Sequence, residues 1–462
     1  MKRRKSTRIR ALHPHLRSDA AGIDIGAREL VVAVPPDCPT AGPLSVRTFR
    51  SFTDELHALA DWLTQCGSKT VAMESTGIYW IPVFQILEAR GFEVCLINAK
   101  QAAGIAGRSK TDVCDAQWLQ YLHACGLLRA SHRPPMQICA LRSVLRHRDR
   151  TVRAAAASTQ HMQKAMNQMN LQLHHVISDI TGKTGLTIID AILAGERDPA
   201  ELAKHRDHRI KADPRTIERS LQGDWQAEHL FTLRQARATY AHYQQQITEC
   251  DTEAEQMLAT FDKANTPGKL PPPTSSHRKA QRNEHRFDAR AALHGILGVD
   301  LTQIPGISAL SAHGLIGEIG TTLEKFPSVR HFASWPFRLR SGHPLGLCPD
   351  NRVSGGAILS SKTRDVPSRA AQIFRIAAQS LHAAKSALGE HYRKMRGRIG
   401  APEAITATAH KLARIYYAVL KTRTPYDESR IAGSPEKQAL KRKQRLEKQA
   451  AKLGFALSPL PT

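Results

Sequence analysis

The chain has 462 residues, of which 66 are Lys or Arg and 41 are Asp or Glu, so its formal net charge is +25. This excess of basic residues argues against an ordinary neutral metabolic enzyme, and a hydrophobic content of 41% argues against a disordered basic tail. At roughly 150 residues per domain, the length predicts about three units.

The expected partner is a nucleic acid and not a membrane. No run approaches about 18 apolar residues, and the basic N-terminus lacks the apolar stretch of a secretory signal. No basic segment has the aromatic and aliphatic face that binding to a membrane surface needs. The eight cysteines contain no Cys-x-x-Cys pair, which favours buried, reduced thiols. We therefore expect a cytoplasmic, nucleoid-associated protein.

The N-terminal segment is strongly basic, because the first ten residues carry six basic side chains and no acid. We interpret residues 1–18 as a basic arm that contacts a phosphate backbone. A solubilising tail explains the same charge about as well.

Residues 19–137 alternate short apolar runs with helical patterns. Two strands separated by a turn at 26–28 are expected to pair as a hairpin, and a third strand follows. Two more strands then alternate with helices, which predicts a mixed α/β sheet. The strands are expected within 21–34, 45–52, 69–76 and 92–99, and the helices within 54–67 and 81–91.

The rest of the chain is expected to be mainly helical. Apolar residues recur every three or four positions in two long runs, 141–176 and 228–261, which predicts an antiparallel helical hairpin within a 138–262 region. The remaining segments are a Pro-rich basic linker at 263–290, a mostly helical unit at 291–425 and a basic tail at 426–462.

Four acids of the α/β unit stand where catalysis is expected. Asp24 lies inside the first strand, with Ile23 and Ile25 facing the other side, so its carboxylate projects from one face. Glu74 ends a strand, at the edge where α/β sheets usually carry their chemistry. The other two acids lie three residues apart on an expected helix and share one face; they are Asp112 and Asp115.

Each acid alone has an ordinary structural explanation. Asp112 can cap a helix, Asp24 can belong to a strand-end turn, and Glu74 can cap the following helix. Their joint placement favours a divalent cation site, because Mg²⁺, or Mn²⁺ in its place, takes carboxylate oxygens together with phosphate and water. Such cations stabilise the attacking and leaving oxygens of a phosphoryl transfer.

Ser354 is the candidate nucleophile of the last unit. It precedes Gly355 and Gly356, where the backbone can turn sharply and a large substrate can approach, although such a sequence is also common in ordinary turns. A serine hydroxyl needs a base or a metal ion to react, and the acidic site is the obvious activator. Nearby cations that can hold a scissile phosphate are Arg352, Lys362, Arg364 and Arg369.

Together these motifs resemble the DEDD transposases of the insertion sequence one-ten family, described as bridge-RNA-guided recombinases. The resemblance covers nearly the whole chain and depends on the order of the motifs. They are GIDIG with Asp24, VAMESTGIYW with Glu74, KTDVCDAQWLQYLHACGLL with Asp112 and Asp115, GLTIIDAILAGERDP, LGLCPDNRVSGG with Ser354, and ALGEHYRKMRGRIGAPEAITATAHKLARI.

The resemblance implies an RNase H-like (Holliday-junction resolvase-like) N-terminal domain, a helical coiled-coil middle and a mostly α-helical C-terminal transposase domain. It implies that Ser354 attacks DNA to form a covalent phosphoserine link while the four acids bind Mg²⁺ beside it. It also implies donor and target DNA as substrates and an element-encoded guide RNA as a partner. The expected assembly is a homo-oligomer, dimer to tetramer, whose composite sites pair domains of different subunits.

Arginines on the first long helix are the candidate surface for the guide RNA, although a solvated helix face explains them equally well. They are Arg142, Arg146, Arg148, Arg150 and Arg153.

The sequence departs from the family pattern at residues 336–344, PFRLRSGHP, which separate FASW from LGLCPDN and contain a second Ser-Gly pair at Ser341. Ser354 remains the expected nucleophile, because its flanking residues match the family motif and those of Ser341 do not.

The leading hypothesis is a DNA recombinase that cuts and rejoins strands through a serine ester. Transesterification conserves the phosphodiester energy, so no ATP is needed, and the Gly-Lys-Thr at 182–184 lacks the earlier glycine of a nucleotide-binding loop. One alternative is a metal-dependent resolvase-type endonuclease in which water attacks and Ser354 only binds phosphate. The other is a non-catalytic RNA-binding protein whose acids are structural.

Overall fold

The computed structural model describes residues 16–38, 45–75, 77–97, 111–128, 130–131, 133–264, 268–273, 283–334, 347–348, 352–360, 363, 368–432 and, with gaps, 440–458. The chain divides into two compact units. The first unit comprises Met1–Arg133 with Leu323–Ala418, and the second comprises Pro134–Thr322 with Val419–Thr462.

A five-stranded mixed sheet forms the N-terminal part of the first unit, with the strand order β3-β2-β1-β4-β5. The first three strands are antiparallel neighbours, whereas β4 runs parallel to both β1 and β5. The hairpin, the third strand and the alternating strands and helices predicted from the sequence are all confirmed. The strands are β1 (Ala20–Ile25), β2 (Glu29–Ala33), β3 (Val46–Arg50), β4 (Thr70–Glu74) and β5 (Glu93–Ile97).

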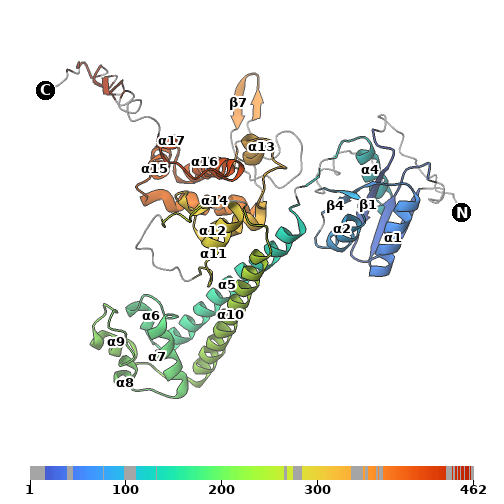
Figure 1. Ribbon diagram of the computed structural model, residues 1–462. Coiled ribbons are helices and arrows are strands. Elements are labelled where there is room, and N and C mark those ends of the chain that lie inside the picture. Colours follow the sequence, from blue (N-terminus) through green and yellow to red (C-terminus); the bar gives the residue numbers. More distant parts are fainter. Residues whose placement is uncertain are drawn as a thin grey trace. The chain divides into compact units, whose positions relative to one another are not determined.

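Helices cover both faces of this sheet (Figure 1). Alternate residues of β1 divide between the faces: Ile23 and Ile25 pack in the core with α1 and α2, whereas Gly22 and Asp24 lie on the face that α4 covers. Pleat alternation therefore directs Asp24 toward α4. The helices are α1 (Thr53–Gln65), α2 (Trp80–Ala89) and α4 (Asp112–Ala124).

At Gly22, the backbone of α4 approaches β1 closely. A Cβ at Gly22 would lie 2.3 Å from the backbone nitrogen of Gln120 and 2.6 Å from the carbonyl oxygen of Ala116. Only glycine fits this space, because both obstacles are backbone atoms that cannot rotate away. The helix is also tied to the strand by the Gln120 side-chain amide, which donates to the Ala20 carbonyl at 3.1 Å.

We expect Gly22→Ala to destabilise the first unit by about 3 kcal/mol, because the added methyl group forces α4 away from the sheet. Thermal unfolding of the full chain measures this effect. Gly397→Ala is the matched control, since Gly397 lies in a helix of the same unit and a Cβ there meets nothing within 4 Å. Equal melting temperatures for the two variants would contradict the close approach at Gly22.

The cysteines correct one expectation. Cys38 and Cys66 form a disulfide between the segment after β2 and the residue that follows α1. The expectation of reduced thiols is therefore wrong for this pair. The two cysteines are 28 residues apart and form no sequence motif. Only the fold brings their Cα atoms to 5.2 Å from each other. Of the free cysteines, Cys95, Cys125 and Cys250 are buried, and Cys114, Cys139 and Cys348 are half-buried.

Two helices of 33 residues, α5 (Met136–Gln168) and α10 (Ala227–Ala259), pack side by side in the second unit as an antiparallel hairpin (Figure 1). Met162, Met166, Leu233 and Tyr240 are buried along the contact between them. Short helices complete one end of the hairpin, and two further helices follow it. These are α6 (Leu173–Val176), α7 (Lys183–Ala194), α8 (Pro199–Ala203), α9 (Pro214–Ser220), α11 (Ala289–Leu297) and α12 (Ala309–Ile319), with a 3₁₀ turn η1 (Leu301–Gln303).

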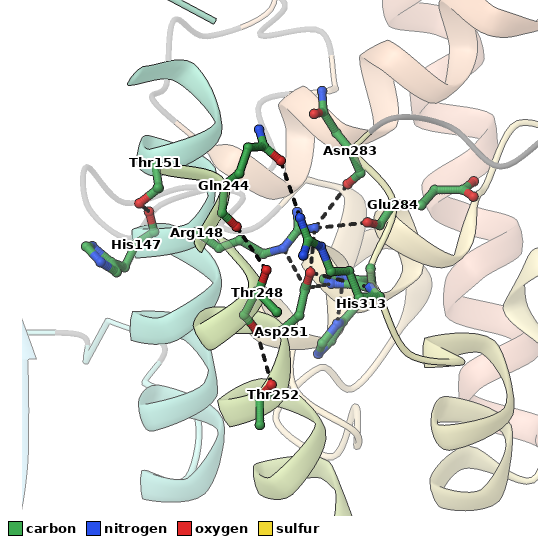
Figure 2. A network of polar contacts seen from close by, with 12 residues as sticks. His147, Arg148, Thr151, Gln244, Thr248, Asp251, Thr252, Asn283, Glu284 and His313 are labelled. Carbon is green, nitrogen blue, oxygen red and sulfur yellow. Dashed lines mark hydrogen bonds and ion pairs between the residues drawn. The ribbon is translucent and has the colours of Figure 1, made fainter. Parts of the chain in front are cut away.

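A buried polar network joins the hairpin to the segment that precedes α11 (Figure 2). Arg148 of α5 makes two hydrogen bonds to Asp251 of α10, at 2.7 and 3.1 Å, and donates to the carbonyls of residues 283–284. His285 Nδ1 lies 2.6 Å from Asp251, and its Nε2 lies 3.0 Å from the Nδ1 of His313. Residues 283–285 therefore pack on the helices, although the sequence placed them in a linker.

The charges of this network favour the ionised form of Asp251. Burial opposes its negative charge, but the hydrogen bonds from His285 and Arg148 outweigh burial and lower the pKa of Asp251. Burial lowers the pKa of His313 to about 3, so its imidazole is neutral. Because the pKa of Asp251 is lower in the folded chain, its stabilising effect is full above the pKa of the unfolded chain and is lost as the pH falls through the folded value.

We expect Asp251→Asn to lower the free energy of unfolding of the second unit by about 3 to 5 kcal/mol, because Arg148 then keeps a buried charge without its counterion. Urea unfolding followed by circular dichroism measures this loss. Asp190→Asn breaks a more exposed pair, between Asp190 of α7 and Arg237 of α10, and should cost at most about 1 kcal/mol. Equal losses in the two variants would show that burial does not set the strength of the Asp251 pair.

The C-terminal part of the first unit is mostly helical around an aromatic cluster. The ring of Phe332 stacks on Tyr416 with centroids 6.0 Å apart, and Phe374 meets Tyr416 edge-on at 5.5 Å. The elements of this part are α13 (Val329–Ser334), β6 (Arg352–Ser354), β7 (Ala357–Ser360), α14 (Arg369–Ser380), η2 (Leu381–Ala383), α15 (Ala387–Ile399), α16 (Ala401–Thr422) and, beyond them, α17 (Ser429–Ala432).

Among the described helices, none combines the length and the apolar content that crossing a lipid bilayer demands.

Candidate active site

The carboxylates of Asp24 and Glu74 lie on neighbouring parallel strands. The registers of β1 and β4 pair Gly22 with Ala72 and Ile23 with Met73, so both acids follow at corresponding positions near the carboxyl ends of their strands. Ala72 packs against α4, and alternation therefore places Glu74, like Asp24, on the α4 face. Both acids are half-buried.

Asp112 and Asp115 lie in the first turn of α4. The N-cap of this helix is Thr111, whose side-chain oxygen accepts a hydrogen bond from the backbone N–H of Cys114 at 3.2 Å. Asp112 is therefore the first residue of the helix and not its cap, which leaves its carboxylate outside the capping hydrogen bond. The close approach of α4 at Gly22 carries this turn toward Asp24.

Asp24 is affected electrostatically by the other three acids. The pKa of Asp24 is raised to about 6, first by burial and then by the negative charges of the other three acids. An acid that resists ionisation beside three like charges is typical of a site that gathers negative charge for a cation. The structure therefore brings together the acids that the sequence singled out.

The donor set suits a divalent cation of the Mg²⁺ type, because all four side chains offer hard oxygen atoms. Among the described residues, however, no three or more Asp, Glu, His or Cys side chains are close enough to hold a metal ion as they stand. The other three carboxylates are near enough to Asp24 to add to the rise in its pKa that burial causes. Holding a cation would require these side chains to rotate toward a common point.

Ser354 occupies the end of a tight hairpin formed by β6 and β7. It pairs with Ala357 across a two-residue turn, Gly355–Gly356, in which both residues have positive φ, at 55° and 80°. Such a turn needs residues that tolerate positive φ, which explains the two glycines. Ser354 and both glycines are exposed, so the hydroxyl group is open to a large substrate.

The cations predicted around Ser354 are only partly described. Arg369 is the first residue of α14 and is half-buried. Lys362, Arg364 and the 336–344 segment with Ser341 lie outside the described residues, as does the side chain of Arg352.

The arginines of α5 differ in their surroundings. Arg142 donates to the carbonyl of Gly317 at 2.8 Å, and Arg146 makes two hydrogen bonds to Glu318, at 2.8 and 2.7 Å. Arg148 is buried in the network described above. The exposed members are Arg146, Arg150 and Arg153.

Sequence reasoning missed two residues that position the acids. Gly22 sets the distance between β1 and α4, and Thr111 caps α4 so that its first turn is fixed. Thr111 carried a signal, since a threonine directly before an acid-rich first turn is typical of a helix start. Gly22 carried none, because its role depends on a helix about one hundred residues away in the sequence.

Two family models match the chain. One, for DEDD transposases of IS110 and described as a transposase, matches residues 21–171, which contain all four acids. The other, described as a transposase of the IS116/IS110/IS902 family, matches residues 298–393, which contain Ser354. No curated protein matches the chain.

An RNase H-like α/β domain bearing a DEDD set of acids, followed by a second transposase domain, defines a DNA transposase. This chain belongs to the IS110 family of transposases. Its substrates are therefore DNA, and its activity is the cleavage and rejoining of DNA strands.

Proposed function

We propose that the protein cuts and rejoins DNA through a covalent serine ester at Ser354. The observation that carries this proposal is the exposed hydroxyl group at the end of a Gly-Gly hairpin inside the matched transposase domain. The Ser354 oxygen attacks the scissile phosphorus, an oxygen–phosphorus bond forms, and the bond to the leaving sugar oxygen breaks. The serine proton passes to a base and the leaving oxygen takes up a proton.

Rejoining reverses this step on the partner strand. A sugar hydroxyl attacks the phosphoserine, the serine oxygen leaves, and a phosphodiester bond is restored. One phosphate ester replaces another at each stage, so the reaction needs no nucleotide cofactor. Because the strand end stays attached to the protein, it is not released between cutting and joining.

The four acids are proposed to hold Mg²⁺ or Mn²⁺, which when bound stabilises negative charge on the reacting phosphate oxygens. The raised pKa of Asp24 supports this role, since a cation would relieve the repulsion among the carboxylates. Arg352, Lys362, Arg364 and Arg369 are proposed to hold the non-bridging oxygens of the same phosphate.

We also propose that an element-encoded guide RNA selects the donor and target DNA, and that the protein acts as a dimer to tetramer with composite sites. The net charge of +25 supports extended contact with nucleic acid. Of the arginines proposed for the RNA surface, Arg146, Arg150 and Arg153 are exposed. Arg142, Arg146 and Arg153 would have to exchange their present partners.

The experiment that tests the serine ester traps the intermediate. The full chain is incubated with Mg²⁺, its RNA and end-labelled DNA of the element, denatured, and separated by electrophoresis. We expect labelled DNA to stay on the protein, and digestion with nuclease and protease followed by mass spectrometry to locate the nucleotide on Ser354. Cleaved DNA without any retained label would contradict the proposal and favour attack by water.

A further inference from the structure

The C-terminal helices carry a group of cationic and imidazole side chains that the proposed chemistry does not use. His410, Lys411 and Arg414 lie within about one turn of α16, and His391 lies on α15. We refer to these four residues as the α16 cation cluster. His391, His410 and Lys411 are half-buried, and Arg414 is exposed.

The described residues provide no counterion for this cluster. None of its four side chains makes an ion pair or a hydrogen bond within the part of the chain that the structure describes. The neighbouring acid Glu390 is already engaged, because its carboxylate pairs with Lys394 at 2.6 Å. Arg146, by contrast, has a carboxylate partner in Glu318.

The charges that act on the cluster are positive. Burial and then Arg414 lower the pKa of both His410 and Lys411. Burial and then the charges of Lys411 and Lys394 lower the pKa of His391. Placing like charges together in a half-buried position costs free energy unless an anion binds there.

One residue of the cluster, Arg414, lies near Cys348, which comes before the serine hairpin in the chain. Burial raises the pKa of the Cys348 thiol, and the nearby positive charge of Arg414 opposes this rise. Cys348 precedes Ser354 by six residues. Arg414, Cys348 and β6 all belong to the C-terminal part of the first unit.

We propose that the α16 cation cluster binds a phosphodiester group of the DNA strand that reaches the serine hairpin. A guanidinium group offers paired donors to phosphate oxygens, and an ammonium group adds a point charge. The imidazoles of His391 and His410 supply further hydrogen bonds. This inference rests on the proposed function and extends it by adding a phosphate contact apart from the four acids and from the cations flanking Ser354.

DNA is favoured over the guide RNA because of position. Arg414 is near Cys348, six residues before Ser354, and the strand to be cut must lie at Ser354 if the serine acts on it. The arginines proposed for RNA lie in the second unit, on α5.

The first test measures how binding depends on salt. Full-length protein is titrated against a fluorescent DNA duplex of about 30 base pairs, at several salt concentrations. We expect Lys411→Met and Arg414→Gln each to reduce the slope of log affinity against log salt by roughly 0.9, the loss of one phosphate contact. Arg396→Gln is the matched control, because Arg396 is exposed on another side of α15 from His391 and should leave the slope nearly unchanged.

Equal reductions in all three variants would show a general charge effect and overturn the site. An unchanged DNA slope in the Lys411 and Arg414 variants, with a reduced slope for an RNA of the same sequence, would assign the cluster to RNA and also overturn the proposal. Unaltered melting temperatures confirm that each variant is folded.

The second test needs no substitution. The wild-type protein is treated briefly with an amine-acylating reagent, alone, with the DNA duplex, with the RNA, or with inorganic phosphate, and digested for mass spectrometry. We expect DNA to protect Lys411 several-fold and to leave the exposed, paired Lys394 less affected. Protection by RNA alone, or by none of the nucleic acids, would contradict a DNA site.

These tests separate this inference from the serine chemistry, because neither requires cleavage. If Ser354→Ala retains the salt slope and the protection of Lys411, the phosphate contact stands even where the serine ester fails. If the adduct forms on Ser354 but Lys411 is unprotected, only the cluster assignment fails.

Discussion

Ser354→Ala is expected to abolish the covalent protein–DNA adduct and all strand joining, with a loss on the order of 10⁴-fold or more in cleavage, because no other atom replaces the nucleophile. Binding of DNA should stay close to that of the wild type, since the exposed serine makes no contact on which the fold depends. Denaturing electrophoresis of labelled DNA measures both cleavage and adduct.

The matched control is Ser341→Ala, which alters the other Ser-Gly pair of this region. We expect it to retain the adduct. Loss of the adduct in the Ser341 variant alone would reassign the nucleophile. Continued cutting without an adduct in the Ser354 variant would instead identify the protein as an endonuclease that uses water, with the serine only binding phosphate.

Asp24→Asn is expected to reduce cleavage by more than about 100-fold. Removing an outer-shell partner of a metal ion costs up to about 100-fold, and the loss of a direct ligand should exceed that. Its effect on stability should have the opposite sign. The raised pKa of Asp24 means that its ionised form is less favourable in the folded chain than in the unfolded chain. Because the group is half-exposed, removing its charge at neutral pH should raise the free energy of unfolding by only about 1 kcal/mol.

Two measurements check this pair of effects. Thermal unfolding without metal should show a melting temperature for Asp24→Asn at or above that of the wild type, and added Mg²⁺ should stabilise the wild type more than the variant. Asp54→Asn, which removes an exposed acid from the first turn of α1, is the control and should leave cleavage intact. Full cleavage by Asp24→Asn would favour a structural role for the acids.

Local patterns were enough to predict most of the N-terminal domain. The alternation around Asp24 indicated which face its carboxylate occupies, and the Ser-Gly-Gly at Ser354 indicated a sharp turn. Both features depend on backbone geometry that neighbouring residues decide, namely the pleat of a strand and the positive φ of glycine. The spacing of Asp112 and Asp115 likewise indicated one helix face.

Long-range contacts are what local patterns could not predict. The arginines of α5 look alike in the sequence, yet Arg148 is buried against Asp251 while Arg150 is exposed. The disulfide between Cys38 and Cys66 was missed for the same reason, since residues 28 positions apart carry no mark of their proximity.

By itself the sequence determined the type and order of the elements, the acids available for a cation and the turn that exposes Ser354, because each follows from residues close together in the chain. Only the tertiary structure decided that Gly22 lets α4 carry its two acids toward Asp24. It also decided that the cations of α16 meet no counterion among the described residues. Charge and packing energies depend on distances through space, and these are defined only when segments remote in the chain come together.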